Sequence, residues 1–210
     1  PFRLRFWRGA EPGFQESHQT WPRAIAAAMP ACQPLRKPIP RIWLMTDPRQ
    51  GDELLAAIRR LPAGSGVVFR HYQLAEKDRR KLFGRVRHVC RLRGHHLFFA
   101  GVERTAIKWG ADGMHSRAAG ATPNHSAPVH TAREIAKAKR NGARLLFLSP
   151  IFATRSHPGA RALGATRFNQ LARLSKPALV IALGGMSRAR GMMLDKRMVH
   201  GWAAIDAFSI

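Results

Sequence analysis

From Arg41 onward the chain repeats one pattern, in which a short apolar run is followed by a segment with helical spacing. The apolar runs are mostly continuous rather than alternating in polarity, which is typical of parallel strands covered on both faces. Strands are predicted at residues 41–46, 66–72, 96–100, 113–116, 127–130, 143–149, 177–183 and 202–208, and helices at 52–61, 76–92, 103–109, 131–141, 166–174 and 187–199. Eight strands in about 170 residues predict a compact α/β fold, the (β/α)8 TIM barrel.

The alternative to a barrel is an open doubly wound sheet, which usually carries a glycine-rich turn after its first strand. Here the first strand ends at Thr46-Asp47-Pro48, without such a turn, which favours the barrel. The fourth unit is irregular, because residues 117–125 are rich in Ala, Gly and Pro and leave no room for a normal helix.

Residues 1–40 do not fit the repeat and are predicted to form an irregular N-terminal extension to a barrel that spans residues 41–210. They contain several prolines and one short apolar helical stretch at 21–29. The extension is either partly ordered, or a segment that caps the bottom of the barrel or contacts a partner in a homodimer.

The chain is strongly basic, with 36 Lys and Arg against 12 Asp and Glu and a formal net charge of +24. Such a charge is expected of proteins that bind nucleic acid or a membrane surface. However, the basic residues are spread over nearly every predicted helix, and no aromatic residues alternate with them to stack on bases. A solvated basic surface is therefore favoured, with nucleic acid kept as a possible partner.

The chain has no apolar run of 18 residues, so no transmembrane helix and no membrane partner are predicted. Its two cysteines, Cys32 and Cys90, are far apart in the sequence. They are interpreted as free thiols in a reducing compartment, which predicts a cytoplasmic protein, although a disulfide stays open.

Two strand ends carry the residues expected of a phosphate site. The strand at 143–149 leads into a loop with Thr154, Ser156 and His157, and the strand at 177–183 ends at Gly184-Gly185. Hydroxyl groups, positive charge and exposed backbone N–H groups at the carboxyl ends of parallel strands are suited to binding phosphate. The sequence therefore predicts a small phosphorylated ligand.

Five short motifs occur in an order and spacing that resemble the thiamine phosphate synthase family, which includes a thiazole tautomerase branch. They are Trp43-Leu44-Met45-Thr46-Asp47, Val67-Val68-Phe69-Arg70, Gly110-Ala111-Asp112-Gly113-Met114-His115, Pro150-Ile151-Phe152-Ala153-Thr154 and Ala182-Leu183-Gly184-Gly185-Met186. The resemblance covers residues 41–208 and implies a (β/α)8 barrel. It also implies coupling of hydroxymethylpyrimidine diphosphate to a thiazole phosphate, with Mg²⁺ assisting the departure of pyrophosphate.

The residues that match the family are those expected at the thiazole phosphate. The family's arginine after its second strand corresponds to Arg70, and its phosphate loop corresponds to residues 154–157, with a serine at 156 and a histidine at 157. Its paired glycines correspond to Gly184 and Gly185. The resemblance thus implies that these residues bind phosphate.

The half of the site that should hold diphosphate and metal departs from the family. Its glutamine and lysine on the second strand are replaced by Val68 and Tyr72, the Asn-Asp pair after the third strand by Ala100-Gly101, and the second metal aspartate by a residue near Gly120. Mg²⁺ is expected from the family, but its carboxylate ligands are not matched, so no metal residues are assigned.

His130 and Arg70 are the candidate catalytic residues. The histidine follows the predicted fifth strand at the position where the tautomerase branch has the residue that moves a proton on the thiazole ring, although the family's nearby serine is replaced by Pro128. A histidine titrates near neutral pH, as a general acid or base requires. Arg70 lies in an apolar strand and is expected to face an anion, whereas His71 points the other way and is structural.

Other charged residues are assigned structural roles. Asp206 is expected to pair with a nearby arginine, and the basic residues of the helix at 76–92, Arg79 among them, are expected to form a solvated outer face. The predicted function is thus thiamine biosynthesis, by a synthase-like protein that binds thiazole phosphate and couples it to the pyrimidine. The alternatives are a tautomerase-like isomerase that uses His130 and a non-catalytic barrel that binds nucleic acid.

Overall fold

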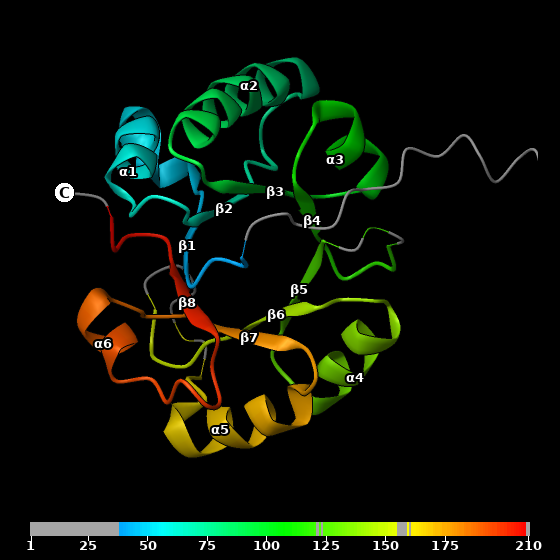
Figure 1. Cartoon of the computed structure of the whole chain (residues 1–210), viewed down its shortest axis with the longest axis vertical. Coiled ribbons are helices and arrows are strands. Elements are labelled where there is room, and N and C mark those ends of the chain that lie inside the picture. The colour runs from blue at the N-terminus through cyan, green and yellow to red at the C-terminus, as the bar shows by residue number, and fades with distance from the viewer. Residues whose placement is uncertain (1–37, 121, 123, 155–158, 160, 209–210) are drawn as a thin grey trace, which may run out of the picture. The chain divides into compact units, whose positions relative to one another are not determined.

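The structure, a computed structural model, describes residues 38–120, 122, 124–154, 159 and 161–208. Eight parallel strands form a closed barrel in sequence order, with each strand paired to the next and β8 paired to β1 (Figure 1). The strands are β1 (Ile42–Met45), β2 (Gly66–Phe69), β3 (His96–Ala100), β4 (Gly113–His115), β5 (His125–Val129), β6 (Leu145–Leu148), β7 (Leu179–Ala182) and β8 (Gly201–Ala204). The predicted (β/α)8 TIM barrel is confirmed.

Helices surround the barrel between successive strands (Figure 1). They are η2 (Pro48–Glu53), α1 (Leu54–Arg60), α2 (Glu76–Leu92), α3 (Glu103–Trp109), α4 (Ala132–Arg140), α5 (Gly164–Ser175) and α6 (Arg188–Met192). Between β4 and β5 the described residues form no helix, in agreement with the irregular fourth unit that the sequence predicts.

Several predicted boundaries differ from the structure; β2, for example, ends at Phe69 rather than at residue 72. The helix predicted at 187–199 ends at Met192, because the Asp195 carboxylate accepts from the Arg197 amide and its carbonyl accepts from Val199, which forms a separate turn. The helix predicted to start at Asp52 starts at Leu54, after a kink at Gly51 with a φ of 44°. The last strand ends at Ala204 rather than at residue 208.

The side chains of each strand alternate between the barrel interior and the helices, as the period of a strand requires. The interior is filled by one cluster, in which Trp43 packs edge-on against Phe98 and Phe147 with ring centroids 5.0 and 5.5 Å apart. Two further clusters pack between the strands and the helices, one around β1–β4 and one around β5–β8. The interior is therefore a packed core, and a ligand is expected to bind at one end of the barrel.

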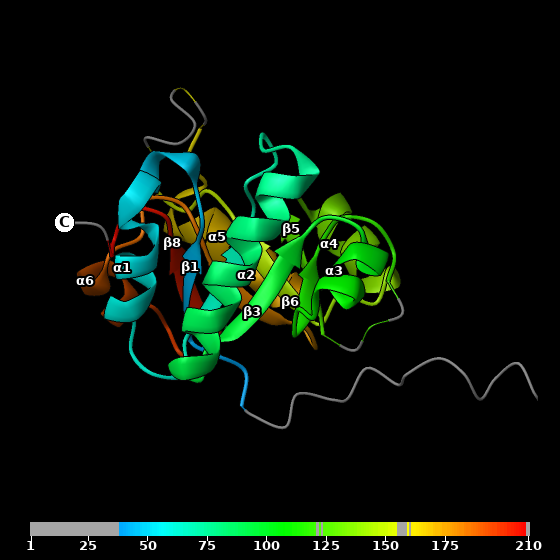
Figure 2. The ribbon, with the colours of Figure 1, turned by 90° about the horizontal axis from the view of Figure 1, so that it is seen from above.

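The segment before β1 covers one end of the barrel. Ile39 packs against the interior cluster, its carbonyl contacts His200 Nε2 at 2.9 Å, and Trp43 Nε1 donates to the Pro40 carbonyl. In the side view this segment lies at the edge opposite to the turn that follows β1 (Figure 2). A site for a ligand is thus expected at the other end, where the strands end. The remainder of the predicted extension, residues 1–37, lies outside the described residues.

In the described part of the chain, no helix is long and apolar enough to cross a bilayer. Cys90 on α2 is a buried free thiol, as the sequence predicts, and Cys32 lies outside the described residues. The helix that carries Cys90 buries Phe83, Val86 and Val89, at the spacing that one face of a helix requires.

Candidate active site

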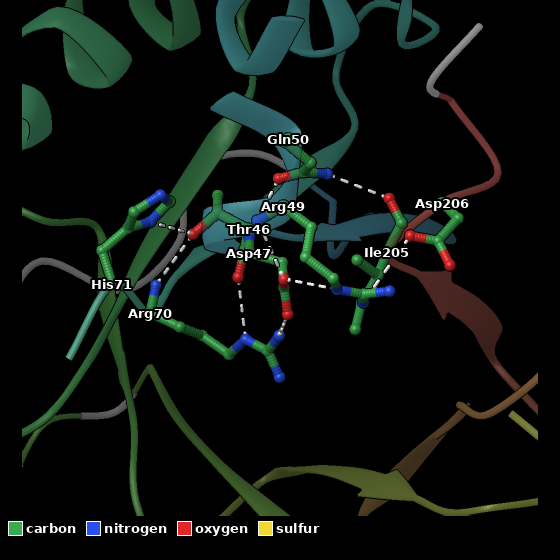
Figure 3. Close-up of polar contacts among 8 residues, drawn as sticks. All are labelled: Thr46, Asp47, Arg49, Gln50, Arg70, His71, Ile205 and Asp206. Carbon is green, nitrogen blue, oxygen red and sulfur yellow. Dashed lines mark hydrogen bonds and ion pairs between the residues drawn. The ribbon is translucent and has the colours of Figure 1, made fainter. Parts of the chain in front are cut away.

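Arg70 follows β2 and lies on the inward side of the barrel, because Val68 two residues earlier belongs to the interior cluster. Its guanidinium is already paired. Nη2 donates to the Asp47 carboxylate at 2.8 Å, and Nε donates to the Thr46 carbonyl at 2.8 Å (Figure 3). Burial lowers the pKa of Arg70, and the Asp47 charge acts in the opposite direction. The anion that the sequence predicts beside Arg70 is therefore the carboxylate of Asp47, a residue of the chain itself.

A chain of polar contacts extends this pair to the end of β8 (Figure 3). The Asp47 carboxylate also accepts from Arg49 Nε at 2.8 Å, and Arg49 lies 3.7 Å from Asp206. Gln50 accepts from the Asp47 amide and donates to the Ile205 carbonyl at 2.9 Å. Asp206 thus pairs with an arginine, as the sequence predicts, and Asp47 and Arg49 are site residues that sequence reasoning did not assign.

His71 is buried and faces away from the interior. Its ring stacks on Phe69 with centroids 5.1 Å apart, and Nδ1 lies 3.0 Å from Thr46 Oγ1. Burial lowers the pKa of this histidine. The structural role that the sequence predicts for His71 agrees with these contacts.

A pocket of about 340 Å³ lies at the carboxyl ends of β6, β7 and β8. It is lined by Thr154, Gly184 and Gly185 of the predicted phosphate site, together with Arg190 and Asp206. Ser156 and His157, also predicted to bind phosphate, lie outside the described residues. The structure therefore brings together, in one pocket, those residues predicted to bind phosphate that it describes.

Both glycines of this pocket have positive φ angles, 96° at Gly184 and 60° at Gly185. A Cβ atom at Gly184 would lie 2.6 Å from Pro150 Cβ, and one at Gly185 would lie 2.5 Å from the Ala153 carbonyl oxygen. Within the described residues, the amides of Gly184, Gly185 and Met186 donate no backbone hydrogen bond. A glycine turn with exposed N–H groups after the seventh strand of a barrel is suited to an anion.

Arg190 adds a positive charge beside this turn. It extends from α6, donates to the Gly185 carbonyl and lies over the Phe152 ring at 4.4 Å from the centroid. These contacts fix the guanidinium at the pocket wall. This role could not be predicted from the sequence, because Arg190 is one of many arginines in predicted helices.

His130 directly follows β5 and is oriented by the end of β6. Its Nδ1 donates to the Ser149 carbonyl at 2.8 Å and lies 3.2 Å from the Ser149 hydroxyl, while its amide donates to Glu134 at 2.6 Å. Because Nδ1 carries the hydrogen, the lone pair of the neutral ring is on Nε2. No described contact occupies Nε2, so this atom is available to exchange a proton.

A second inward histidine, His115 at the end of β4, was assigned no function from the sequence. The Ser126 hydroxyl donates to the Met114 carbonyl at 3.0 Å and so accepts from His115 Nδ1, also at 3.0 Å. Burial lowers the pKa of His115 to about 3. The charges of Arg70, His125 and Arg117 act in the same direction with smaller effects. This histidine is therefore neutral at physiological pH.

The family's Mg²⁺ does not fit the residues that are present. β3 ends at Ala100 and is followed by Gly101, at the positions where the family has its metal ligands, and Gly120 packs against Met114. The described residues contain no group of three or more His, Cys, Asp or Glu that could hold a metal ion. The carboxylate of Glu103, near Gly120, is used within the chain, since it accepts from the Thr122 amide at 2.6 Å.

Comparison with known proteins agrees with this architecture. Residues 42–208 match the model of a family described as thiamine monophosphate synthase. "Putative thiamine-phosphate synthase 2" from Aquifex aeolicus is 28% identical, across 81% of this chain and 98% of that protein. Thiamine phosphate pyrophosphorylase from Pyrococcus furiosus superimposes with a TM-score of 0.66 at 22% identity, covering 80% of this chain and 86% of that one. The corresponding protein from Bacteroides thetaiotaomicron gives 0.54 at 15% identity, with 80% and 83% covered.

Proposed function

The chain belongs to the thiamine monophosphate synthase family, and on this basis we propose that it binds a phosphorylated thiazole of thiamine biosynthesis and isomerises the ring by proton transfer through His130. The observation that carries the proposal is the hydrogen bond from His130 Nδ1 to the Ser149 carbonyl. It directs the lone pair of Nε2 away from β6, as a general base requires.

The phosphate group is proposed to bind at the Gly184-Gly185 turn. Three features support this position: the amides of the turn, which donate no backbone hydrogen bond within the described residues, the Arg190 guanidinium, and the pocket volume of about 340 Å³, which suits a small ligand. Asp206 also lines the pocket, but its charge is partly offset by Arg49. Thr154, which also lines the pocket, is proposed to bind the phosphate together with Ser156 and His157.

The turn and the histidine are joined by a short, rigid connection. Ser149 is followed by Pro150, which packs on Gly184, and the Ile151 amide donates to the Leu183 carbonyl at 3.0 Å. A ligand held by its phosphate is therefore anchored to the same segment that orients His130. In the proposed reaction, Nε2 accepts a proton from one position of the thiazole and returns it at another, so that no atom is gained or lost.

Isomerisation is favoured over coupling to a pyrimidine diphosphate by the residues around β3. A coupling enzyme must stabilise the departing pyrophosphate, and the metal ligands implied by the family are replaced here. Proton transfer on one bound ring requires neither a metal nor a leaving group. Histidine catalysis of this kind contributes roughly 10²–10⁴-fold to a rate.

The test is to incubate the protein with thiazole carboxylate phosphate in D2O and to follow deuterium incorporation and isomerisation by NMR. We expect His130→Asn to lower the rate at least 100-fold, because the amide can still donate to Ser149 but has no basic nitrogen. His88→Asn, on the exposed face of α2, is the matched control and should leave the rate unchanged. Equal rates for His130→Asn and the parent, or no binding of the ligand at millimolar concentration, would refute the proposal.

A further inference from the structure

Arg79 lies over the carboxyl ends of β2 and β3, although the sequence predicts a solvated outer face for it. It extends from the first turns of α2, and its Nη2 donates to the Arg70 and Ala100 carbonyls, both at 2.7 Å. The guanidinium also lies 4.5 Å from the centroid of Phe99 and 5.3 Å from that of Tyr72. Its position over the ends of β2 and β3 is therefore fixed by both hydrogen bonds and ring contacts.

The positive charge of Arg79 is not neutralised by the described residues. No carboxylate among them lies within 4.0 Å of its guanidinium, whereas Arg70 has Asp47 at 2.8 Å. Its Nε is buried and has no hydrogen-bond partner among the residues that the structure describes. A partly buried cation with an incomplete set of partners is costly in a protein and is stabilised when an anion is brought to it.

The position of this charge coincides with the half of the site that lacks metal ligands. Ala100, which accepts from Arg79, is one of the two residues that replace the family's Asn-Asp pair. We propose that Arg79 forms a binding site for a second anionic group of the ligands, and that this site works without a divalent cation. The anion is either a diphosphate or the carboxylate of a thiazole carboxylate phosphate, since a guanidinium binds both in the same way.

The first test measures the binding of inorganic pyrophosphate to the full chain by calorimetry, in EDTA and in MgCl2. We expect binding in EDTA, with an affinity at least about tenfold lower in Arg79→Gln, because a charge-assisted hydrogen bond is lost. Arg80→Gln removes the same charge from an exposed position one residue away and should have no effect. If pyrophosphate binds only in the pocket at the Gly184-Gly185 turn, its affinity should instead fall in Arg190→Gln and stay unchanged in Arg79→Gln.

The second test compares thiazole phosphate with and without its carboxylate, and this arm alone rests on the proposed function. If Arg79 binds the carboxylate, the affinity difference between the two ligands disappears in Arg79→Gln. An effect of Arg79→Gln on either probe supports the site and identifies its anion. The proposal is overturned if neither probe responds, or if pyrophosphate binds only with added Mg²⁺.

Because Arg79 also joins β2 to β3, its replacement could alter the fold. Each variant is therefore checked by near-UV circular dichroism. Arg79→Lys serves as a second variant, since it keeps the charge but cannot donate to both carbonyls and a ligand in the same plane. We expect its affinity for the responding probe to lie between those of the parent and Arg79→Gln, and a folded Arg79→Lys that binds both probes as the parent does would count against the site.

Discussion

The Asp47 carboxylate lies 2.8 Å from the Arg70 guanidinium, and the same carboxylate accepts from Arg49 at 2.8 Å. One acidic side chain thus offsets two cations at the barrel mouth, in a chain with a net charge of +24. Burial acts to raise the pKa of Asp47, but the hydrogen bonds from Arg49 and the charges of Arg49 and Arg70 outweigh it, so the pKa lies below its usual value. Asp47 is therefore expected to stabilise the fold as well as to orient Arg70.

Asp47→Asn should lower the free energy of unfolding by about 1.5–3 kcal/mol at pH 7, because Arg70 loses a charged partner while the cap of η2 is kept. Urea denaturation measures the loss. Since the folded pKa is depressed, this stabilisation is present above the unfolded pKa near 4 and disappears as the pH falls below it. The difference between parent and variant should therefore shrink below pH 4. Asp52→Asn, at an exposed carboxylate, is the control.

His115 should make the protein less stable in mild acid. Its pKa is lowered to about 3 in the fold and is about 6.5 in the unfolded chain, so between these values the unfolded state binds more protons. Stability therefore falls as the pH decreases, by up to about 1.4 kcal/mol per pH unit from this group. His115→Asn should flatten the decline between pH 6 and 4 in thermal melts, whereas His88→Asn should not. An unchanged slope in His115→Asn would mean that other groups dominate acid unfolding.

Much of the fold could be predicted from the sequence because a strand buried on both faces leaves a continuous apolar run, such as residues 145–148. The short α6 could not, because the turn at Asp195 depends on a local side-chain contact that helical spacing does not reveal. In the site, Gly184 and Gly185 follow from a recognisable motif. Arg79 and Asp47 do not, because their roles depend on pairing between residues 9 to 23 positions apart in a chain rich in arginine.

Replacement of glycine by alanine should have opposite effects on stability at Gly184 and at Gly84, because the surroundings of the two residues differ. Gly184→Ala should destabilise the protein by about 1–3 kcal/mol, because the residue has a positive φ and its Cβ would contact Pro150 at 2.6 Å. It should also weaken phosphate binding in calorimetry. Gly84→Ala should stabilise the protein by roughly 0.5–1 kcal/mol, because this helical glycine has no neighbour within 4 Å of an added Cβ. Stabilisation by Gly184→Ala would contradict the turn geometry described here.

Cys90 should report global unfolding. Its side chain is 1% exposed, and burial, with a smaller effect of the Asp112 charge, raises the pKa of the thiol to about 12. At pH 8 only about one thiol in ten thousand would be ionised in the fold, and the thiolate is the reactive form. In a Cys32→Ser variant, which leaves Cys90 as the single thiol, labelling by a disulfide reagent should therefore follow the rate of unfolding and accelerate with urea. Rapid labelling of the native Cys32→Ser protein, at a rate independent of urea, would show that α2 opens locally and that Cys90 is not sealed beneath it.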